Sequence, residues 1–130
     1  MPAHEKDATF IWNELVTRDS AKAAAFFAEL IGWTAETMDM PTGAYTMFKK
    51  DGVPAAGMLD MRQHDIPDAV PPHWMAYIQV PDVDASAARV ADLGGTVVVP
   101  PMDIPTVGRF CVITDPTGAH VSLITMAETC

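Results

Sequence analysis

Two stretches of this 130-residue chain decide the fold: Trp12–Trp33, WNELVTRDSAKAAAFFAELIGW, and Met75–Thr96, MAYIQVPDVDASAARVADLGGT. Each begins with a run typical of a β-strand and continues through an aspartate or serine that can cap a helix. An alanine-rich amphipathic segment follows and ends at glycine, the usual residue after a helix. A shift of 63 residues aligns six identical residues in the two stretches. The shared order of features predicts a duplicated strand–helix unit.

The capping residues give the bounds of the predicted helices, and turn signals give those of the strands. The first helix is expected from Asp19 or Ser20 to Ile31–Gly32, and the second from Asp82 or Asp84 to Gly94–Gly95. Three short extended runs follow each helix: 34–40, 44–50, 55–61, 96–101, 109–115 and 120–126. The turn signals between runs are Pro41–Gly43, Asp51–Gly52 and Asp115–Gly118. The pattern predicts an α+β fold with two βαβββ modules; an ordinary α+β domain without duplication is the alternative.

The length of the chain is typical of one domain, expected to span 1–130. Module one is expected at about 8–61, a polar, proline-bearing linker at 62–72, and module two at about 73–127. The longest apolar runs fall well short of a membrane span, and the first ten residues lack the apolar core of a signal peptide. We therefore expect a soluble, cytoplasmic protein that does not bind a membrane.

The net charge and the number of cysteines exclude two further classes of protein. The formal net charge is −9 and there is no cluster of lysine or arginine, so nucleic-acid binding is not expected. Two cysteines, Cys111 in an apolar run and Cys130 at the last position, are too few for a disulfide scaffold. Cys111 is expected to be an inert core thiol, because no histidine is evidently placed to activate it.

Several motifs in both halves resemble one known family. They are DGVPAAGM (51–58), VPDVDASAARVADLGG (80–95), VVVPPMDIPTVGRF (97–110) and DPTGAHVSL (115–123). The chain resembles the vicinal oxygen chelate superfamily, which includes glyoxalases, bleomycin resistance proteins and extradiol dioxygenases, and in particular a glyoxalase-like subgroup. The resemblance covers nearly the whole chain and implies two βαβββ modules that form a curved mixed sheet around a cavity. It also implies that the chain pairs with itself as a homodimer, in which the two modules pair either within one chain or between two chains.

The resemblance further implies four metal-ligand positions, one on the first and one on the last strand of each module. Those positions are Trp12, Ala56 or Gly57, Met75, and Ser122. None of these residues is a standard ligand for a divalent ion, which prefers imidazole or carboxylate in such sites. We therefore expect no metal and no other cofactor. The alternative is a displaced metal site that uses His73 and His120, each two residues before a lost ligand position.

Strand alternation, anchored on those positions, predicts which side chains line the cavity. The predicted ligand-binding residues are Trp12, Glu14, Met58, Met75, Tyr77, Gln79, Ser122 and Ile124, with Arg109 at the mouth and Leu59 as the alternative to Met58. Glu14 is the candidate acid–base catalyst, since burial beside an aromatic ring raises the pKa of a carboxyl group. A structural hydrogen bond to Tyr77 or to a backbone amide is the alternative for Glu14. Arg109 could bind an anion, or form a salt bridge to Asp103 or Asp115, and Asp60 could be a cavity acid or a hairpin-end residue.

This lining suits a small apolar or aromatic molecule, oriented by two or three hydrogen bonds. The first hypothesis is therefore a metal-free, small-molecule-binding protein, with or without acid–base chemistry. The second is a metal-dependent lyase or dioxygenase of the same superfamily, and the third is a regulatory or assembly subunit whose cavity is filled by side chains. The identity of the ligand does not follow from the sequence.

Overall fold

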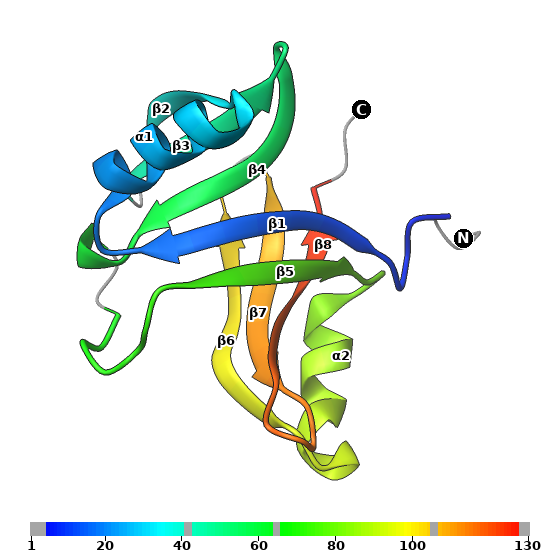
Figure 1. Cartoon of the computed structure of the whole chain (residues 1–130). Helices are drawn as coiled ribbons and strands as arrows, with labels where there is room; N and C mark the ends of the chain where they lie inside the picture. The colour runs from blue at the N-terminus through cyan, green and yellow to red at the C-terminus, as the bar shows by residue number, and fades with distance from the viewer. Residues whose placement is uncertain (1–4, 41–42, 64–65, 105–106, 128–130) are drawn as a thin grey trace. The chain divides into compact units, whose positions relative to one another are not determined.

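A computed structural model describes residues 5–40, 43–63, 66–104 and 107–127 (Figure 1). The chain forms two compact units, one made of 13–74 and the other of 75–130 together with 1–12. The elements, in chain order, are β1 (Phe10–Thr17), α1 (Ser20–Ile31), β2 (Thr34–Met40), β3 (Gly43–Lys50), β4 (Val53–Asp60), β5 (His73–Gln79), α2 (Val83–Val90), β6 (Thr96–Ile104), β7 (Gly108–Thr114) and β8 (His120–Met126). This order confirms the α+β class and the two βαβββ modules.

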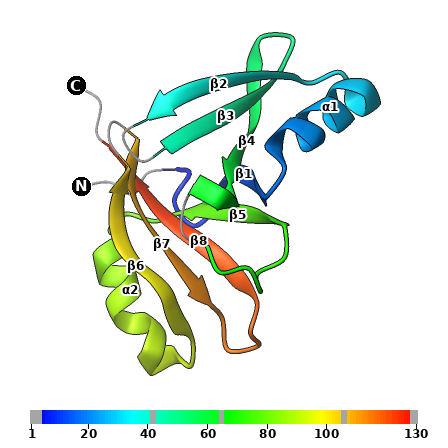
Figure 2. The same cartoon turned by 90° about the vertical axis from the view of Figure 1, so that its left-hand side faces the viewer.

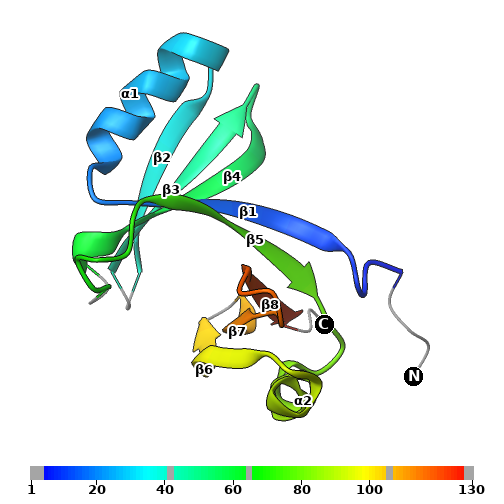
Figure 3. The same ribbon diagram turned by 60° about the horizontal axis from the view of Figure 1, so that its bottom comes forward.

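Module one is a four-stranded mixed sheet in the order β2-β3-β4-β1. β1 runs parallel to β4, and the other neighbours are antiparallel. Figure 3 shows α1 along one face of β2, β3 and β4. The core under the helix contains Leu15, Phe48, Ala56 and Met58, against which Phe27 and Trp33 pack.

The predicted bounds of α1 are confirmed by its caps. The Asp19 carboxylate accepts a hydrogen bond from the Lys22 amide at 3.0 Å, which satisfies one of the free N–H groups of the first turn. Gly32 has φ +76°, in the left-handed region that glycine adopts without a steric penalty, and its N–H bonds to the Ala28 carbonyl. Local sequence therefore determines both ends of this helix.

Module two repeats the arrangement with the strand order β5-β8-β7-β6. Figure 2 shows α2 beside this sheet, and the core between them contains Val83, Cys111 and Leu123. The Asp82 carboxylate caps α2 by accepting from the Ala85 amide at 3.2 Å. A short 3₁₀ turn over Ala91–Leu93 continues the helix to Gly94, as the sequence predicts.

The edge strand β6 extends further than predicted, to Ile104, and includes Pro100 and Pro101. Its pairing with β7 shifts register between Val97 and Val99 and again between Val99 and Met102. Proline lacks an N–H and is tolerated in a strand only at an edge or at an irregularity, and β6 provides both. The first turn signal, Pro41–Gly43, lies largely outside the described residues, whereas Asp51–Gly52 forms the expected tight turn, with φ +51° and +81°.

The segment between the modules is held by one side chain of module one. Arg18, which follows β1, donates from Nη2 to the carbonyl oxygens of Pro67, Asp68 and Val70 at 2.9, 2.9 and 2.6 Å. A guanidinium carries several donors in a planar group and is suited to such convergent carbonyls. Among the described residues, no helix has the length and apolar character that crossing a membrane requires.

Candidate functional site

The face of the module-two sheet opposite α2 gathers most of the predicted binding residues. Tyr77 pairs with Ser122 and Gln79 with Ile124 across β5 and β8, and β7 places Val112 beside Ser122 and Phe110 beside Ile124. Paired residues point to the same face of a sheet, and side chains alternate along each strand. We call this surface the Tyr77 face: Met75, Tyr77, Gln79, Phe110, Val112, Ser122 and Ile124. None of the seven is charged.

Ser122 is the unusual member of the Tyr77 face. Its side chain is fully buried, at 0 % exposure. Among the residues that the structure describes, its Oγ is the one buried side-chain oxygen or nitrogen without a hydrogen-bond partner. Leaving a buried hydroxyl unpaired costs about 1–3 kcal/mol, so a polar partner for this oxygen would be favourable.

The neighbours of Ser122 are aromatic and apolar. The rings of Tyr77 and Phe110 lie 6.3 Å apart between centroids, within the range of favourable aromatic pairs. Tyr77, Met75 and Ile124 are all buried. Gln79 is also buried, and its side-chain amide donates to the Asp7 carboxylate at 3.2 Å, so one of its hydrogen-bond donors is already used.

Glu14 and Trp12 lie on β1 and belong to different compact units. Glu14 is buried, at 7 % exposure, and pairs with Gly57 across β1 and β4. It therefore points to the face of the module-one sheet opposite α1, as the sequence predicts. Trp12 is half-buried. The strand register also decides between Ala56 and Gly57, the two alternatives for the last-strand ligand position of module one. Gly57 pairs with Glu14 as Ser122 pairs with Tyr77 in module two, so Gly57 occupies that position.

The same register corrects the prediction for Met58. Met58 pairs with Leu15, and both belong to the core cluster under α1. Because adjacent residues of a strand point to opposite faces, Met58 cannot share a face with Glu14 and Gly57. It is a core residue, and Leu59 occupies the face that the sequence analysis assigned to Met58.

Arg109 also lies away from the Tyr77 face. It alternates with Phe110 on β7 and points to the side of α2, where Nε and Nη2 bind the Asp84 carboxylate at 2.8 and 3.1 Å. Nη1 binds Asp103 at 3.1 Å, one of the two salt bridges that the sequence suggests. Hydrogen bonds from Arg109 lower the pKa of Asp84 below its usual range. The guanidinium of Arg109 is thus bound to two carboxylates, and an anionic ligand would have to displace them.

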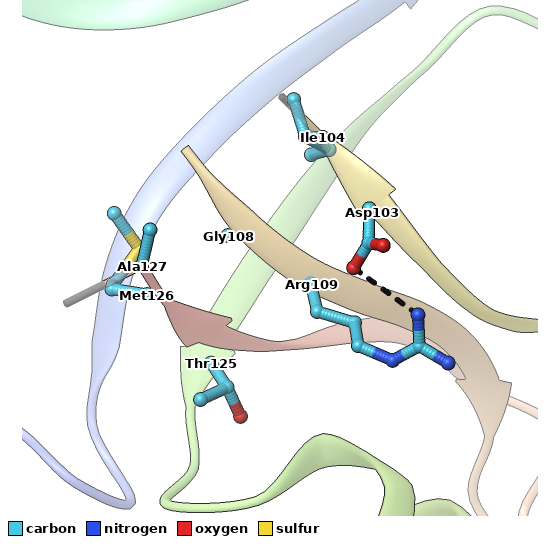
Figure 4. A pocket seen from close by; sticks show the side chains of 7 residues that line it. All are labelled: Asp103, Ile104, Gly108, Arg109, Thr125, Met126 and Ala127. Carbon is cyan, nitrogen blue, oxygen red and sulfur yellow. Dashed lines mark hydrogen bonds and ion pairs between the residues drawn. The ribbon is translucent and has the colours of Figure 1, made fainter. Parts of the chain in front are cut away.

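An open hollow of about 560 Å³ lies where β6 and β8 end and β7 begins (Figure 4). In Figure 4 the guanidinium of Arg109 lies against Asp103, while Ile104 and Met126 line other parts of the hollow. By register, Gly108 and Met126 continue the Tyr77 face to the edge of the sheet. Gly108 is required there, because a Cβ would lie within 2.3 Å of the Thr125 carbonyl oxygen.

The residues at the family's metal positions do not fit a divalent cation. Indole offers no lone pair, the thioether of Met75 is a weak and soft ligand, Gly57 has no side chain, and Ser122 presents a neutral hydroxyl. Within residues 5–40, 43–63, 66–104 and 107–127, no three His, Cys, Asp or Glu side chains lie together as a metal site requires. His73 is half-buried with Nδ1 2.8 Å from the Pro71 carbonyl, and His120 is exposed.

Two other candidates have structural roles. Asp60 is buried on the helix side of β4 and accepts hydrogen bonds from the backbone and guanidinium of Arg62, which lower the pKa of its carboxyl group. Ser20, the first residue of α1, also donates a long hydrogen bond to Asp60 at 3.5 Å, so all these contacts of the acid lie within module one. Burial raises the pKa of the Cys111 thiol, which fits an unreactive core residue.

These features define a protein of two βαβββ modules, with an uncharged and largely apolar sheet face in module two. The chain belongs to the Glyoxalase/Bleomycin resistance protein/Dioxygenase superfamily, whose model matches residues 9–123. The chain is 38 % identical over 117 residues to the Mycobacterium tuberculosis protein named "Putative glyoxylase CFP32". It is 36 % identical over 120 residues to the anthracycline biosynthesis protein DnrV of Streptomyces peucetius. These matches cover 89 % and 83 % of the chain.

The chain spans less than half the length of these curated relatives, 43 % in each case. Among solved structures, it is similar to methylmalonyl-CoA epimerase from Mycobacterium tuberculosis, with a TM-score of 0.60, 19 % identity and coverage of 98 % of this chain and 94 % of that one. A variant of Streptomyces coelicolor methylmalonyl-CoA epimerase, in complex with 2-nitronate-propionyl-CoA, gives a TM-score of 0.63 and 17 % identity, with coverage of 94 % and 96 %. At such identities the likeness describes the fold alone.

Proposed function

We propose that this protein binds a small, uncharged aromatic molecule on the Tyr77 face, without the divalent cation of its metal-dependent relatives. The observation that carries the proposal is the buried Ser122 hydroxyl, which has no partner in the described structure. A ligand carbonyl or hydroxyl would complete its hydrogen bonding and remove the cost of the unpaired group.

The chemistry of the surrounding residues selects the class of ligand. Tyr77 and Phe110 offer ring faces and edges that a flat aromatic molecule can contact. No residue of the Tyr77 face carries a charge, and Arg109 is bound to Asp84 and Asp103 on the other side of the sheet. A carboxylate or phosphate buried on this face would have no counter-charge, which favours neutral ligands.

Three matched probes test this proposal: 2-acetylnaphthalene, 2-ethylnaphthalene and 2-naphthoate. They share one ring system but offer a neutral acceptor, no polar atom and an anion, respectively. We expect calorimetric titration to rank the ketone first and the anion last. Ser122→Ala is expected to weaken binding of the ketone by up to about tenfold, the value of one neutral hydrogen bond, and to leave binding of the hydrocarbon unchanged.

The unliganded protein provides an independent readout. Because Ser122→Ala removes an unpaired buried hydroxyl, its thermal unfolding midpoint is expected to equal or exceed that of the wild type. Ser86→Ala, on α2, is the matched control. A clear loss of stability in Ser122→Ala would mean that the hydroxyl already has a partner within the protein, and would contradict the proposal.

The metal-free part of the proposal is tested on tag-free protein by elemental analysis. We expect substoichiometric Ni, Zn, Fe, Mn and Cu, and no change of unfolding midpoint when these ions are added. Near-stoichiometric metal that is lost in His73→Ala or His120→Ala would instead establish the displaced site of a lyase or dioxygenase.

We also propose Glu14 as the acid–base residue for a molecule bound against the module-one face opposite α1. Glu14 is a buried carboxyl group on the face opposite α1, where a proton acceptor is shielded from water. In that case Glu14→Gln abolishes turnover and retains binding of the ligand. Equal turnover by Glu14→Gln and the wild type would leave Glu14 with a supporting role in the sheet.

A further inference from the structure

Gln79, at the end of β5, holds the N-terminal segment of the chain through three of its polar groups. Its carbonyl oxygen accepts a hydrogen bond from the Ala8 amide at 2.7 Å, and its own amide donates to the Thr9 carbonyl oxygen at 2.9 Å. Its side-chain Nε2 donates to the Asp7 carboxylate at 3.2 Å. Figures 1 and 3 show the segment before β1 turning back beside the end of β5. Three successive residues are thus attached to one residue of the Tyr77 face.

The backbone of this segment is strained where it passes Gln79. Ala8 has φ +62°, in the left-handed region that residues with a Cβ rarely adopt. A turn holds it there, because the amide and the hydroxyl of Thr9 both donate to the Lys6 carbonyl oxygen, at 3.2 and 2.5 Å. Such conformations persist only where surrounding contacts maintain them, and they are concentrated at functional sites. The strained turn therefore gives the Asp7 side chain a defined position.

The Asp7 carboxylate decides which way the side-chain amide of Gln79 is turned. An ionised carboxylate only accepts hydrogen bonds, whereas a carboxamide has a donating NH₂ group and an accepting oxygen. Nε2 must therefore face Asp7, and Oε1 takes the other side. Asp7 is half-buried and Gln79 is buried, so this contact is largely shielded from water. The end of the amide directed away from the N-terminal segment is thus a hydrogen-bond acceptor.

We propose that Asp7 is a positioning residue that makes Gln79 select aromatic ligands with a hydrogen-bond donor, such as a phenolic hydroxyl. Resting on the proposed function, this role names the chemical class of the molecule that the Tyr77 face binds. Asp7 acts through Gln79 and does not contact the ligand. Oε1 of Gln79 accepts a hydrogen bond from the ligand hydroxyl, whereas the opposite orientation of the amide would favour a ligand acceptor.

The spacing of Gln79 and Ser122 fits a ligand with a polar group at each end. Gln79 pairs with Ile124, which lies two residues beyond Ser122 on the neighbouring strand. From the usual distance between strands and the rise of two residues along a strand, the Cα atoms of Gln79 and Ser122 are about 8 Å apart. A bicyclic aromatic molecule can span that distance. Ser122 is suited to a carbonyl at one end of the molecule, and Gln79 to a hydroxyl at the other.

The first test compares three ligands that share one ring system and one ketone: 2-acetylnaphthalene and its 6-hydroxy and 6-methoxy derivatives. The methoxy group has the same oxygen as the hydroxyl but no donor. We expect calorimetric titration of the wild type to give up to about tenfold tighter binding of the hydroxy than of the methoxy compound, the value of one neutral hydrogen bond. The parent ketone reports on the Tyr77 face itself.

The second test asks whether the preference for the hydroxy compound depends on Asp7. Asp7→Ala removes the group that orients the amide, so the ratio of the two affinities should fall toward one, while the affinity for the parent ketone changes little. Ala8→Val should act in the same direction without removing a polar group, because a β-branched residue is a steric outlier in the left-handed region. Glu5→Ala is the matched control, since it removes an exposed acid of the same segment and should keep the wild-type ratio.

The orientation of the amide also has a readout that requires no ligand. In the nuclear magnetic resonance spectrum of isotope-labelled protein, the two NH₂ protons of Gln79 should differ in chemical shift, because one of them is bound to a carboxylate. Asp7→Ala should move both signals toward the values of an exposed glutamine amide. Glu5→Ala should leave them in place.

Four outcomes overturn the proposal. If the parent ketone binds but the hydroxy and methoxy compounds bind equally, the ligand class is wrong and the proposed function stands. If Asp7→Ala leaves the affinity ratio and the Gln79 signals unchanged, Asp7 does not position the amide. An equal loss of affinity for all three compounds in Asp7→Ala would assign Asp7 a purely structural role. If none of the three compounds binds, the proposed function itself fails, and the role of Asp7 fails with it.

Discussion

Helices α1 and α2 hold equivalent places in the two modules, but the surface that α2 exposes is charged and the surface that α1 exposes is apolar. α2 buries Val83 and Val90 in its own module, and its exposed side includes Asp84 and Arg89. α1 buries no residue and exposes Phe26, Leu30 and Ile31. The same strand–helix arrangement therefore supports two tasks. In module two the helix completes a core, whereas in module one it also offers an apolar surface.

The largest difference in stability is expected between two variants that each replace one phenylalanine by alanine. Phe48→Ala empties a fully buried position in the module-one core and is expected to cost about 3–5 kcal/mol. Phe26→Ala, on the exposed side of α1, should change the free energy of unfolding by less than about 0.5 kcal/mol. Both values are measured by urea unfolding at a concentration where the chain is monomeric. A cost for Phe26→Ala near that of Phe48→Ala in the monomer would show that the outer side of α1 is packed, and would remove the contrast between the helices.

Removing a helix cap should have a smaller effect on the free energy of unfolding, and the effect should be equal in the two modules. Asp19 and Asp82 both accept a hydrogen bond from the amide three residues later. Asp19→Ala and Asp82→Ala are each expected to cost about 1 kcal/mol in the free energy of unfolding. Asp39→Ala, exposed on β2, is the control. Unequal costs would mean that the modules differ in how their helices begin as well as in the surfaces they expose.

The smallest effect on stability should come from breaking the ion pair that joins α2 to the sheet of module two. Arg109 holds the pKa of Asp84 below its ordinary value of 3.8. Because the folded-state pKa is lowered, the stabilisation is present above about pH 4 and is lost as the pH falls through the lowered value. Arg109→Gln should therefore reduce the unfolding midpoint at pH 7 more than at pH 2. Arg89→Gln, with the same change of charge, should show no such dependence on pH.

Sequence reasoning succeeded where the signal is local. The caps Asp19 and Gly32 act within one turn of the helix, and the strand β8 has the predicted bounds of 120–126. It failed for Met58, because assigning a face requires the register of β4 against β1, and a gap of one residue inverts the face.

Two features of the site depend on groups far apart in the chain. Arg109 binds Asp84, 25 residues earlier, and no local pattern indicates that pair. The unpaired state of the Ser122 hydroxyl depends on every neighbour of its oxygen, so it becomes visible only in the folded structure. In contrast, the absence of the usual metal ligands at Trp12, Met75 and Ser122 could be read directly from the sequence.

The two prolines of β6 have a consequence for how this protein avoids aggregation. Strand edges with free N–H groups can template the addition of a strand from another molecule. Pro100 and Pro101 remove two consecutive N–H donors from the edge strand β6, and the register shifts around them interrupt its regular pairing. Backbone-mediated stacking of chains along β6 is thus disfavoured. Contacts between molecules are left to side chains, whose chemistry can be selective and can limit an assembly to a defined size.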